Sequence, residues 1–77
     1  MRTPARIVDI SAGGIGLILR HPFKEGTELL VRLHTTVVDR PLPVKIVHVA
    51  EIAPDVYLLG GAFTVPFPAD ELDKLLS

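Results

Sequence analysis

Residues 9–14, Asp-Ile-Ser-Ala-Gly-Gly, decide how this chain folds, because they separate two apolar runs of strand length. The runs are 5–8 (Ala-Arg-Ile-Val) and 15–19 (Ile-Gly-Leu-Ile-Leu), both rich in branched aliphatic side chains. Asp9 and Ser11 occupy alternate positions and so point to the same side of an extended chain. Gly14 and the glycine before it allow the backbone to turn with positive φ or to pass close to another molecule. The stretch is typical both of a polar ligand site and of a capped hairpin turn, and the residues alone leave both interpretations open.

Glycine and proline divide the rest of the chain into further short apolar runs. They predict strands at about 5–10, 14–20, 27–34, 42–52 and 56–65. Only residues 68–76 have a helical pattern: Pro68 suits the first helical position, and Leu72, Leu75 and Leu76 share one face. Five short strands followed by one helix predict an all-β fold, a small antiparallel split barrel of about five or six strands with a short C-terminal helix.

Local signals in the fourth and fifth runs predict how these strands lie in the sheet. Pro41 and Pro43 lack N–H donors, so the fourth strand is expected to begin at a sheet edge. Alternation places His48 on the apolar face of the strand at 42–52, which predicts a half-buried histidine. The glycine pair at 60–61 predicts a bulge or a close approach of the backbone.

The composition limits the classes of protein to which the chain can belong. Its 77 residues predict one domain, residues 1–77, and the lack of cysteine excludes disulfides and thiolate chemistry. A net charge of −1 excludes the broad basic surface that duplex nucleic acid requires, so no DNA partner is expected. No apolar run is long enough for a membrane span and no signal peptide opens the chain, which predicts a cytoplasmic domain without a membrane partner.

The polar residues do not form a pattern typical of an enzyme. Ser11 is the only serine in the interior of the sequence, and no histidine lies near it in sequence to act as a base. His21, His34 and His48 are spaced too widely for a local metal motif, and no cysteine or carboxylate spacing supports zinc. We therefore predict no catalytic residue, no metal site and no enzymatic activity.

Arg2 and Arg6 flank the first predicted strand, and Arg6 stands three residues before Asp9. Guanidinium groups bind phosphate or the O6/N7 edge of guanine with two hydrogen bonds, and they stack on purines. A cyclic dinucleotide presents all three features in one small anion. The alternative interpretation, that both arginines are ordinary solvent-exposed charges, is the one that residue type alone favours.

The motif Asp9-x-Ser11-x-x-Gly14 between two strands resembles the second signature of PilZ domains. The resemblance continues through 26–33, 42–49 and 60–63 and into the final helix, so it covers nearly the whole chain. It implies a six-stranded antiparallel barrel that acts as a bacterial receptor for cyclic di-GMP. In such domains the Asp and Ser hydrogen-bond a guanine edge and the Gly lets the ligand approach closely. These roles fall on Asp9, Ser11 and Gly14, and no cofactor is implied besides cyclic di-GMP as the ligand.

The other signature of the family, R-x-x-x-R, lies on a loop well upstream of the Asp. Arg2 and Arg6 spell this pattern, but it runs directly into the strand that carries Asp9, so we interpret the match as a coincidence. Without an arginine clamp, Asp9 and Ser11 cannot neutralise two phosphates, which predicts weakened or lost ligand binding. The alternative is a ligand-independent interaction module, an adaptor that docks on a partner protein.

The clamp and the strand that usually follows it are expected to be missing, and this also predicts how the chain assembles. A barrel without that strand leaves an edge of unpaired N–H and C=O groups, and residues 7–10 contain no proline to protect it. The small core of a 77-residue chain would gain from further burial. We therefore expect a homodimer, or another homo-oligomer, in which edge strands pair or are exchanged.

Overall fold

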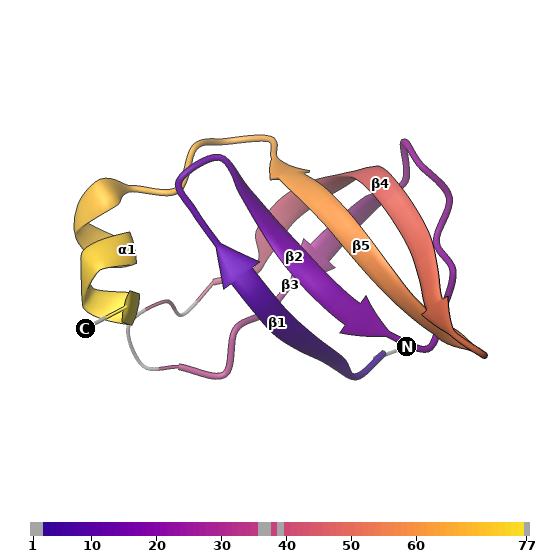
Figure 1. The fold of residues 1–77 in the computed structure, drawn as a ribbon. Coiled ribbons are helices and arrows are strands. Elements are labelled where there is room, and N and C mark those ends of the chain that lie inside the picture. The colour runs from indigo at the N-terminus through magenta and orange to yellow at the C-terminus, as the bar shows by residue number, and fades with distance from the viewer. Residues whose placement is uncertain (1–2, 36–37, 39, 77) are drawn as a thin grey trace.

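The chain folds into one curved antiparallel sheet with a short helix at one end (Figure 1). A computed structural model describes residues 3–35, 38 and 40–76. The elements are β1 (Ala5–Ile10), β2 (Gly14–Leu19), β3 (Glu28–Val31), β4 (Leu42–Ala53), β5 (Val56–Phe63) and α1 (Ala69–Leu76). The strand order is β1-β2-β5-β4-β3, so β5 is central and the sheet closes only half of a barrel. The predicted all-β class, antiparallel pairing and C-terminal helix are confirmed.

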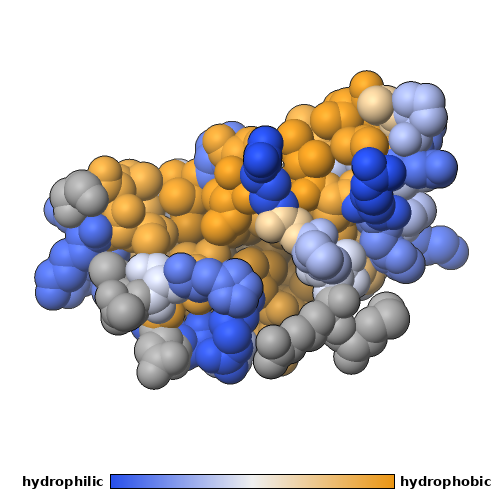
Figure 2. All heavy atoms as spheres, turned by 90° about the horizontal axis from the view of Figure 1, so that it is seen from below, coloured by the Kyte–Doolittle hydropathy of each residue, from blue (hydrophilic) through white to orange (hydrophobic). Residues whose placement is uncertain are grey.

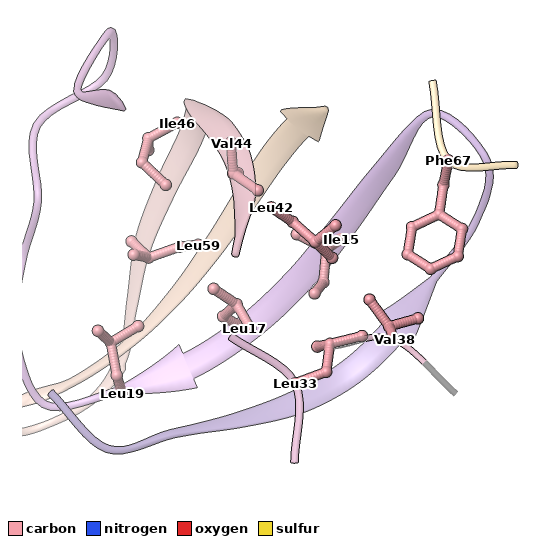
Figure 3. Packing of buried hydrophobic residues seen from close by; sticks show 10 residues of the cluster. All are labelled: Ile15, Leu17, Leu19, Leu33, Val38, Leu42, Val44, Ile46, Leu59 and Phe67. Carbon is pink, nitrogen blue, oxygen red and sulfur yellow. The ribbon is translucent and has the colours of Figure 1, made fainter. Parts of the chain in front are cut away.

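One face of the sheet carries the core, and alternation along the strands explains which residues form it. In β2, Ile15, Leu17 and Leu19 are buried, and they alternate with residues of the opposite face. The full cluster of buried apolar side chains comprises Ile15, Leu17, Leu19, Leu33, Val38, Leu42, Val44, Ile46, Leu59 and Phe67 (Figure 3). We call the side of the sheet that bears these residues the inner face and the opposite side the outer face.

The glycine at position 61 lets the three central strands pack around a shared core position. Gly61 lies opposite Ile15 of β2 and Ile46 of β4, both almost completely buried. A Cβ atom at Gly61 would collide with Cγ1 of Val44, a side chain that has no exposed surface. The close approach predicted from the pair at 60–61 is therefore confirmed, and its cause is the side chain of Val44.

The pairing of β4 differs from the prediction at His48. The register shifts between Ile46, opposite Gly61, and His48, opposite Gly60, so Val47 is an extra residue in the strand. Such a bulge reverses the alternation beyond it. His48 therefore lies on the outer face and is exposed, and the prediction of a half-buried histidine beside Ile46 is wrong.

Pro43, at the start of β4, lies where the strand has a ladder partner on one side alone. The ladder with β3 includes this residue, but the ladder with β5 begins only at Val44, so the strand begins as an edge on that side and lies inside the sheet from there on. Pro43 lies opposite Leu30 of β3, and its carbonyl accepts a hydrogen bond from the N–H of Thr64. The nitrogen of Pro43 thus faces the side of β5, beyond the last paired residue Phe63, where no ladder hydrogen bond needs a donor.

Helix α1 is held against the open end of the half-barrel by apolar contacts and one ion pair. Leu72 and Leu75 are partly buried and pack against the core cluster as predicted, whereas Leu76, predicted to share their face, is 64% exposed. Arg40 donates two hydrogen bonds of 2.7 Å to the carboxylate of Glu71, which joins the loop before β4 to the helix. These hydrogen bonds lower the pKa of Glu71 and raise that of Arg40.

The contact between Gly61 and Val44 predicts different effects of alanine at neighbouring glycines. Gly61→Ala should lower the free energy of unfolding by about 1–3 kcal/mol, because the core must shift to admit the methyl group. Gly60→Ala is the matched control, since its Cβ would lie 3.4 Å from the Cβ of His48, an ordinary contact. Chemical denaturation measures the free energy of unfolding of both variants. Equal stability of the two variants would contradict the proposed packing, and Val44→Ala should partly rescue Gly61→Ala.

The ion pair predicts a pH-dependent contribution to stability. The pKa of Glu71 is lower in the folded protein, so its contribution is present above the ordinary pKa of a glutamate and disappears as the pH falls through the folded value. Glu71→Gln should therefore destabilise the protein more at about pH 7 than at about pH 3. Urea denaturation at both values checks this, with Asp73→Asn on the same helix as the control. A pH-independent difference between wild type and Glu71→Gln would contradict it.

Candidate functional site

Asp9 lies on the outer face because β1 contains a bulge. The register shifts between Ile7, opposite Leu17, and Asp9, opposite Gly16. A Cβ atom placed on Gly16 would lie 2.8 Å from Oδ1 of Asp9 and 3.1 Å from Cγ2 of Val8, so both side chains lie over this glycine. The Asp9 side chain is exposed, and the described part of the chain gives its carboxylate no hydrogen bond or ion pair.

The same bulge brings Arg6 to the face that bears Asp9. Side chains three positions apart in a regular strand point to opposite faces of the sheet. The extra residue at Val8 shifts the alternation by one, so that Arg6 and Asp9 lie on the same face. Arg6 lies opposite Ile18, which shares the outer face with Gly16. Arg6 is exposed. The structure therefore joins Arg6 and Asp9 on one surface, whereas Arg2 lies outside the described residues.

Ser11 belongs to the turn that follows β1. Its backbone N–H donates a 2.9 Å hydrogen bond to the carbonyl of Gly14, which closes the turn. Its hydroxyl lies 3.5 Å from the same carbonyl, a long contact that leaves the group available to a ligand. Strand alternation, on which the predicted alignment of Ser11 with Asp9 rests, ends at Ile10, so Ser11 is placed by the turn and not by the strand.

The backbone of this turn is fixed by the C-terminal part of the chain. The carbonyl of Ala12 accepts a 2.8 Å hydrogen bond from the N–H of Phe67, and that of Gly13 accepts one of 3.0 Å from Phe63. The rings of Phe63 and Phe67 also contact each other, with centroids 5.5 Å apart. The turn that carries Ser11 is thus rigidly joined to the end of β5 and to the segment that leads into α1.

Gly14 is needed for close packing. Among the described glycines only Gly26 has a positive φ, so the expectation of positive φ at Gly14 is wrong. Gly14 is the first residue of β2, and a Cβ atom there would lie 2.6 Å from the carbonyl oxygen of Gly61. The extended backbone therefore excludes a side chain because β5 passes so close to it.

The outer face beside Asp9 is a strip of residues that carry no side chain larger than a methyl group, and one of them, Gly16, is buried beneath Asp9 and Val8. Gly14 lies opposite Ala62, and Gly16 lies opposite Gly60 in the neighbouring strand. His48 and Lys45 of β4 stand opposite Gly60 and Ala62, on the far side of the strip from Asp9. We define the glycine strip as Gly14, Gly16, Gly60 and Ala62.

This strip has the chemistry to receive a flat polar ring. Apart from Gly16, the residues of the strip are partly exposed and carry no side chain beyond a methyl group, so a ligand can lie directly on their backbone. An acidic acceptor stands on one side, and a lysine and an imidazole stand on the other. Sequence reasoning missed Lys45 and His48 as members of this surface; the glycine pair at 60–61 is the signal that points to it.

The described residues give no support for a metal centre or a membrane span. No three His, Cys, Asp or Glu side chains among them gather closely enough to hold a metal ion. His21 and His34 are exposed and lie in loops. No helix in the described ranges is long and apolar enough to cross a membrane.

The role of Gly14 predicts a difference between the two adjacent glycines of the turn. Gly14→Ala should reduce the free energy of unfolding by about 1–3 kcal/mol, because its methyl group meets the backbone of β5. Gly13→Ala should leave stability nearly unchanged, since no atom lies within 4 Å of the added Cβ and φ is not positive. Thermal denaturation of both variants tests the difference. A fully stable Gly14→Ala variant would show that β2 and β5 are farther apart than described.

Comparison with known proteins identifies one protein family whose model matches this chain. No curated protein and no solved structure matched the chain. The model of the PilZ domain matches residues 2–77, which is almost the entire sequence. PilZ domains are binding domains of the cyclic di-GMP type, and the motif of Asp9, Ser11 and Gly14 lies here at the end of a curved sheet, beside the glycine strip. The fold and the family match together show that this chain belongs to the PilZ domain family.

Proposed function

We propose that this protein is a bacterial, cytoplasmic signalling receptor for cyclic di-GMP, without enzymatic activity, that binds its ligand weakly through Asp9, Ser11 and Gly14. The observation that carries the proposal is the exposed Asp9 carboxylate, which lies over Gly16 at the edge of the glycine strip without a partner among the described residues. A carboxylate in this state can accept hydrogen bonds from the N1–H and N2–H groups of guanine.

The neighbouring residues support the same ligand. The Ser11 hydroxyl stands in a rigid turn where it can donate to a ring nitrogen or carbonyl of the base. Gly14 keeps the backbone beside it free of a side chain. A purine that lies on Gly14, Gly60 and Ala62 would contact peptide groups, with the Asp9 side chain at its edge, which suits a planar aromatic ring.

Weak binding follows from the charges available to the phosphates. Cyclic di-GMP carries two negative charges, and Asp9 adds a third nearby. Among the described arginines only Arg6 lies in the strand pair that bears the motif, and it is held on the outer face opposite Ile18. One guanidinium supplies fewer charge-assisted hydrogen bonds than a clamp of two, so affinity is reduced.

Calorimetric titration with cyclic di-GMP tests this function, with cyclic di-AMP as the control ligand. Asp9→Ala should weaken binding by about 1–3 kcal/mol, the usual scale for a lost hydrogen bond to a charged group. Asp73→Ala, an exposed acid on α1, is the matched control and should bind like the wild type. Equal binding of the two cyclic dinucleotides would contradict recognition of a guanine edge.

Substitution of Arg6 and Arg2 tests whether these two arginines bind the phosphates of the ligand. If Arg6 contacts phosphate, Arg6→Ala should weaken binding, and adding Arg2→Ala should weaken it further only if the two arginines form a clamp. Wild-type affinity of the double variant would exclude both arginines from the site. Undetectable binding by the unchanged chain would exclude the receptor function and favour the second candidate.

The second candidate is a ligand-independent interaction module, and the exposed strand β1 favours it. Within the described residues β1 pairs only with β2, and Ile7 and Val8 remain 43% and 46% exposed. An edge strand with exposed apolar side chains is a common docking site for another protein chain.

A further inference from the structure

Strand β1 is the exposed edge of the sheet that is best suited to pair with another strand. All of its residues except Ile10 are exposed, and its free side has no partner strand among the described residues. The opposite edge, β3, is only four residues long. Figure 2 shows that apolar surface covers much of the molecule when it is seen from below. β1 contains no proline, and its bulge and its two charges, which commonly protect edge strands, favour pairing only with a strand of matching charge.

The bulge makes β1 self-complementary in charge. Ile7 lies opposite Leu17, Arg6 lies one pair away on one side, and Val8 and Asp9 together occupy the next pair on the other side. A rotation of the strand by 180° about an axis that passes through Ile7, perpendicular to the sheet, therefore exchanges the positions of Arg6 and Asp9. Without the bulge, the same rotation would exchange Arg6 with Val8 and leave the charges unmatched.

We propose that two copies of this chain associate through β1, in an antiparallel register centred on Ile7, so that Arg6 of each copy lies opposite Asp9 of the other. Residues directly opposite each other in an antiparallel pair share a face, so both ion pairs form on the outer face. Ile7 of one copy meets Ile7 of the second copy on the inner face. The twofold arrangement is closed, because the same strand supplies both halves of the contact.

The proposal deepens the interaction role of the domain and does not rest on cyclic di-GMP. It names a second copy as the partner, on the ground that an unrelated strand would not match both charges of β1 at once. The contact is a single strand pair and is smaller than the interface of a stable dimer, which buries about 1,200–2,000 Å². We therefore expect a dissociation constant between about 10 μM and 1 mM.

Sedimentation equilibrium of the 77-residue chain without ligand, at concentrations up to about 1 mM, tests the association. Arg6→Glu and Asp9→Arg should each weaken the dimer at least about tenfold, because like charges then face each other twice. An equimolar mixture of these two variants should form a heterodimer, since each cross-strand pair again joins an acid to an arginine. The mixture also serves as a folding control, because only folded variants can form the heterodimer.

Arg32→Glu, which makes the same charge change beyond the end of β3, is the matched control and should leave the dimer unchanged. A chain that remains monomeric at about 1 mM would overturn the proposal, as would a mixture that fails to associate. An equal loss of association in Arg6→Glu and Arg32→Glu would also overturn it. Because no ligand is present, none of these results bears on the binding of cyclic di-GMP.

Discussion

The close packing of Gly61 against its neighbours sets the spacing of the strands that carry both the core and the candidate site. Its missing side chain leaves room for Val44 in the core, and its carbonyl oxygen approaches β2 so closely that position 14 must also be glycine. β5 is the central strand and holds the two halves of the sheet together. The separation of β2, β5 and β4 at this point therefore depends on two residues without side chains.

The candidate site depends on the same contact. Gly14 is at once the last residue of the family motif and the point where β2 passes closest to β5. The turn before it is held by the N–H groups of Phe63 and Phe67, which come from the end of β5 and the segment after it. The backbone of the motif is thus part of the packed structure, while the side chains of Asp9 and Ser11 stay exposed. A rigid turn that presents free polar groups is preorganised for binding.

Strand β1 contributes to both proposed interactions. In the proposed ligand complex Asp9 accepts hydrogen bonds from the guanine edge, and in the proposed dimer it pairs with Arg6 of the second copy. Both roles require Asp9 on the outer face, where the bulge at Val8 places it. A bulge that turns one carboxylate to the outer face therefore determines which surface of the domain is polar and how the exposed edge can pair. Bulges at sheet edges commonly redirect side chains in this way.

The strands, the turns, the helix and the family motif could be predicted from the amino-acid sequence, because they follow from local patterns of apolar residues, glycine and proline. The alternation of β3, which exposes Leu30 and half-buries Leu29, is one example, and the two-residue turn between Ala53 and Val56 is another. The two bulges, the faces of Arg6 and His48, the place of β4 between β5 and β3, and the reason for Gly14 became visible only once the strands were paired. Each of these depends on which strand lies alongside, and a single extra residue in one strand reverses every side chain beyond it.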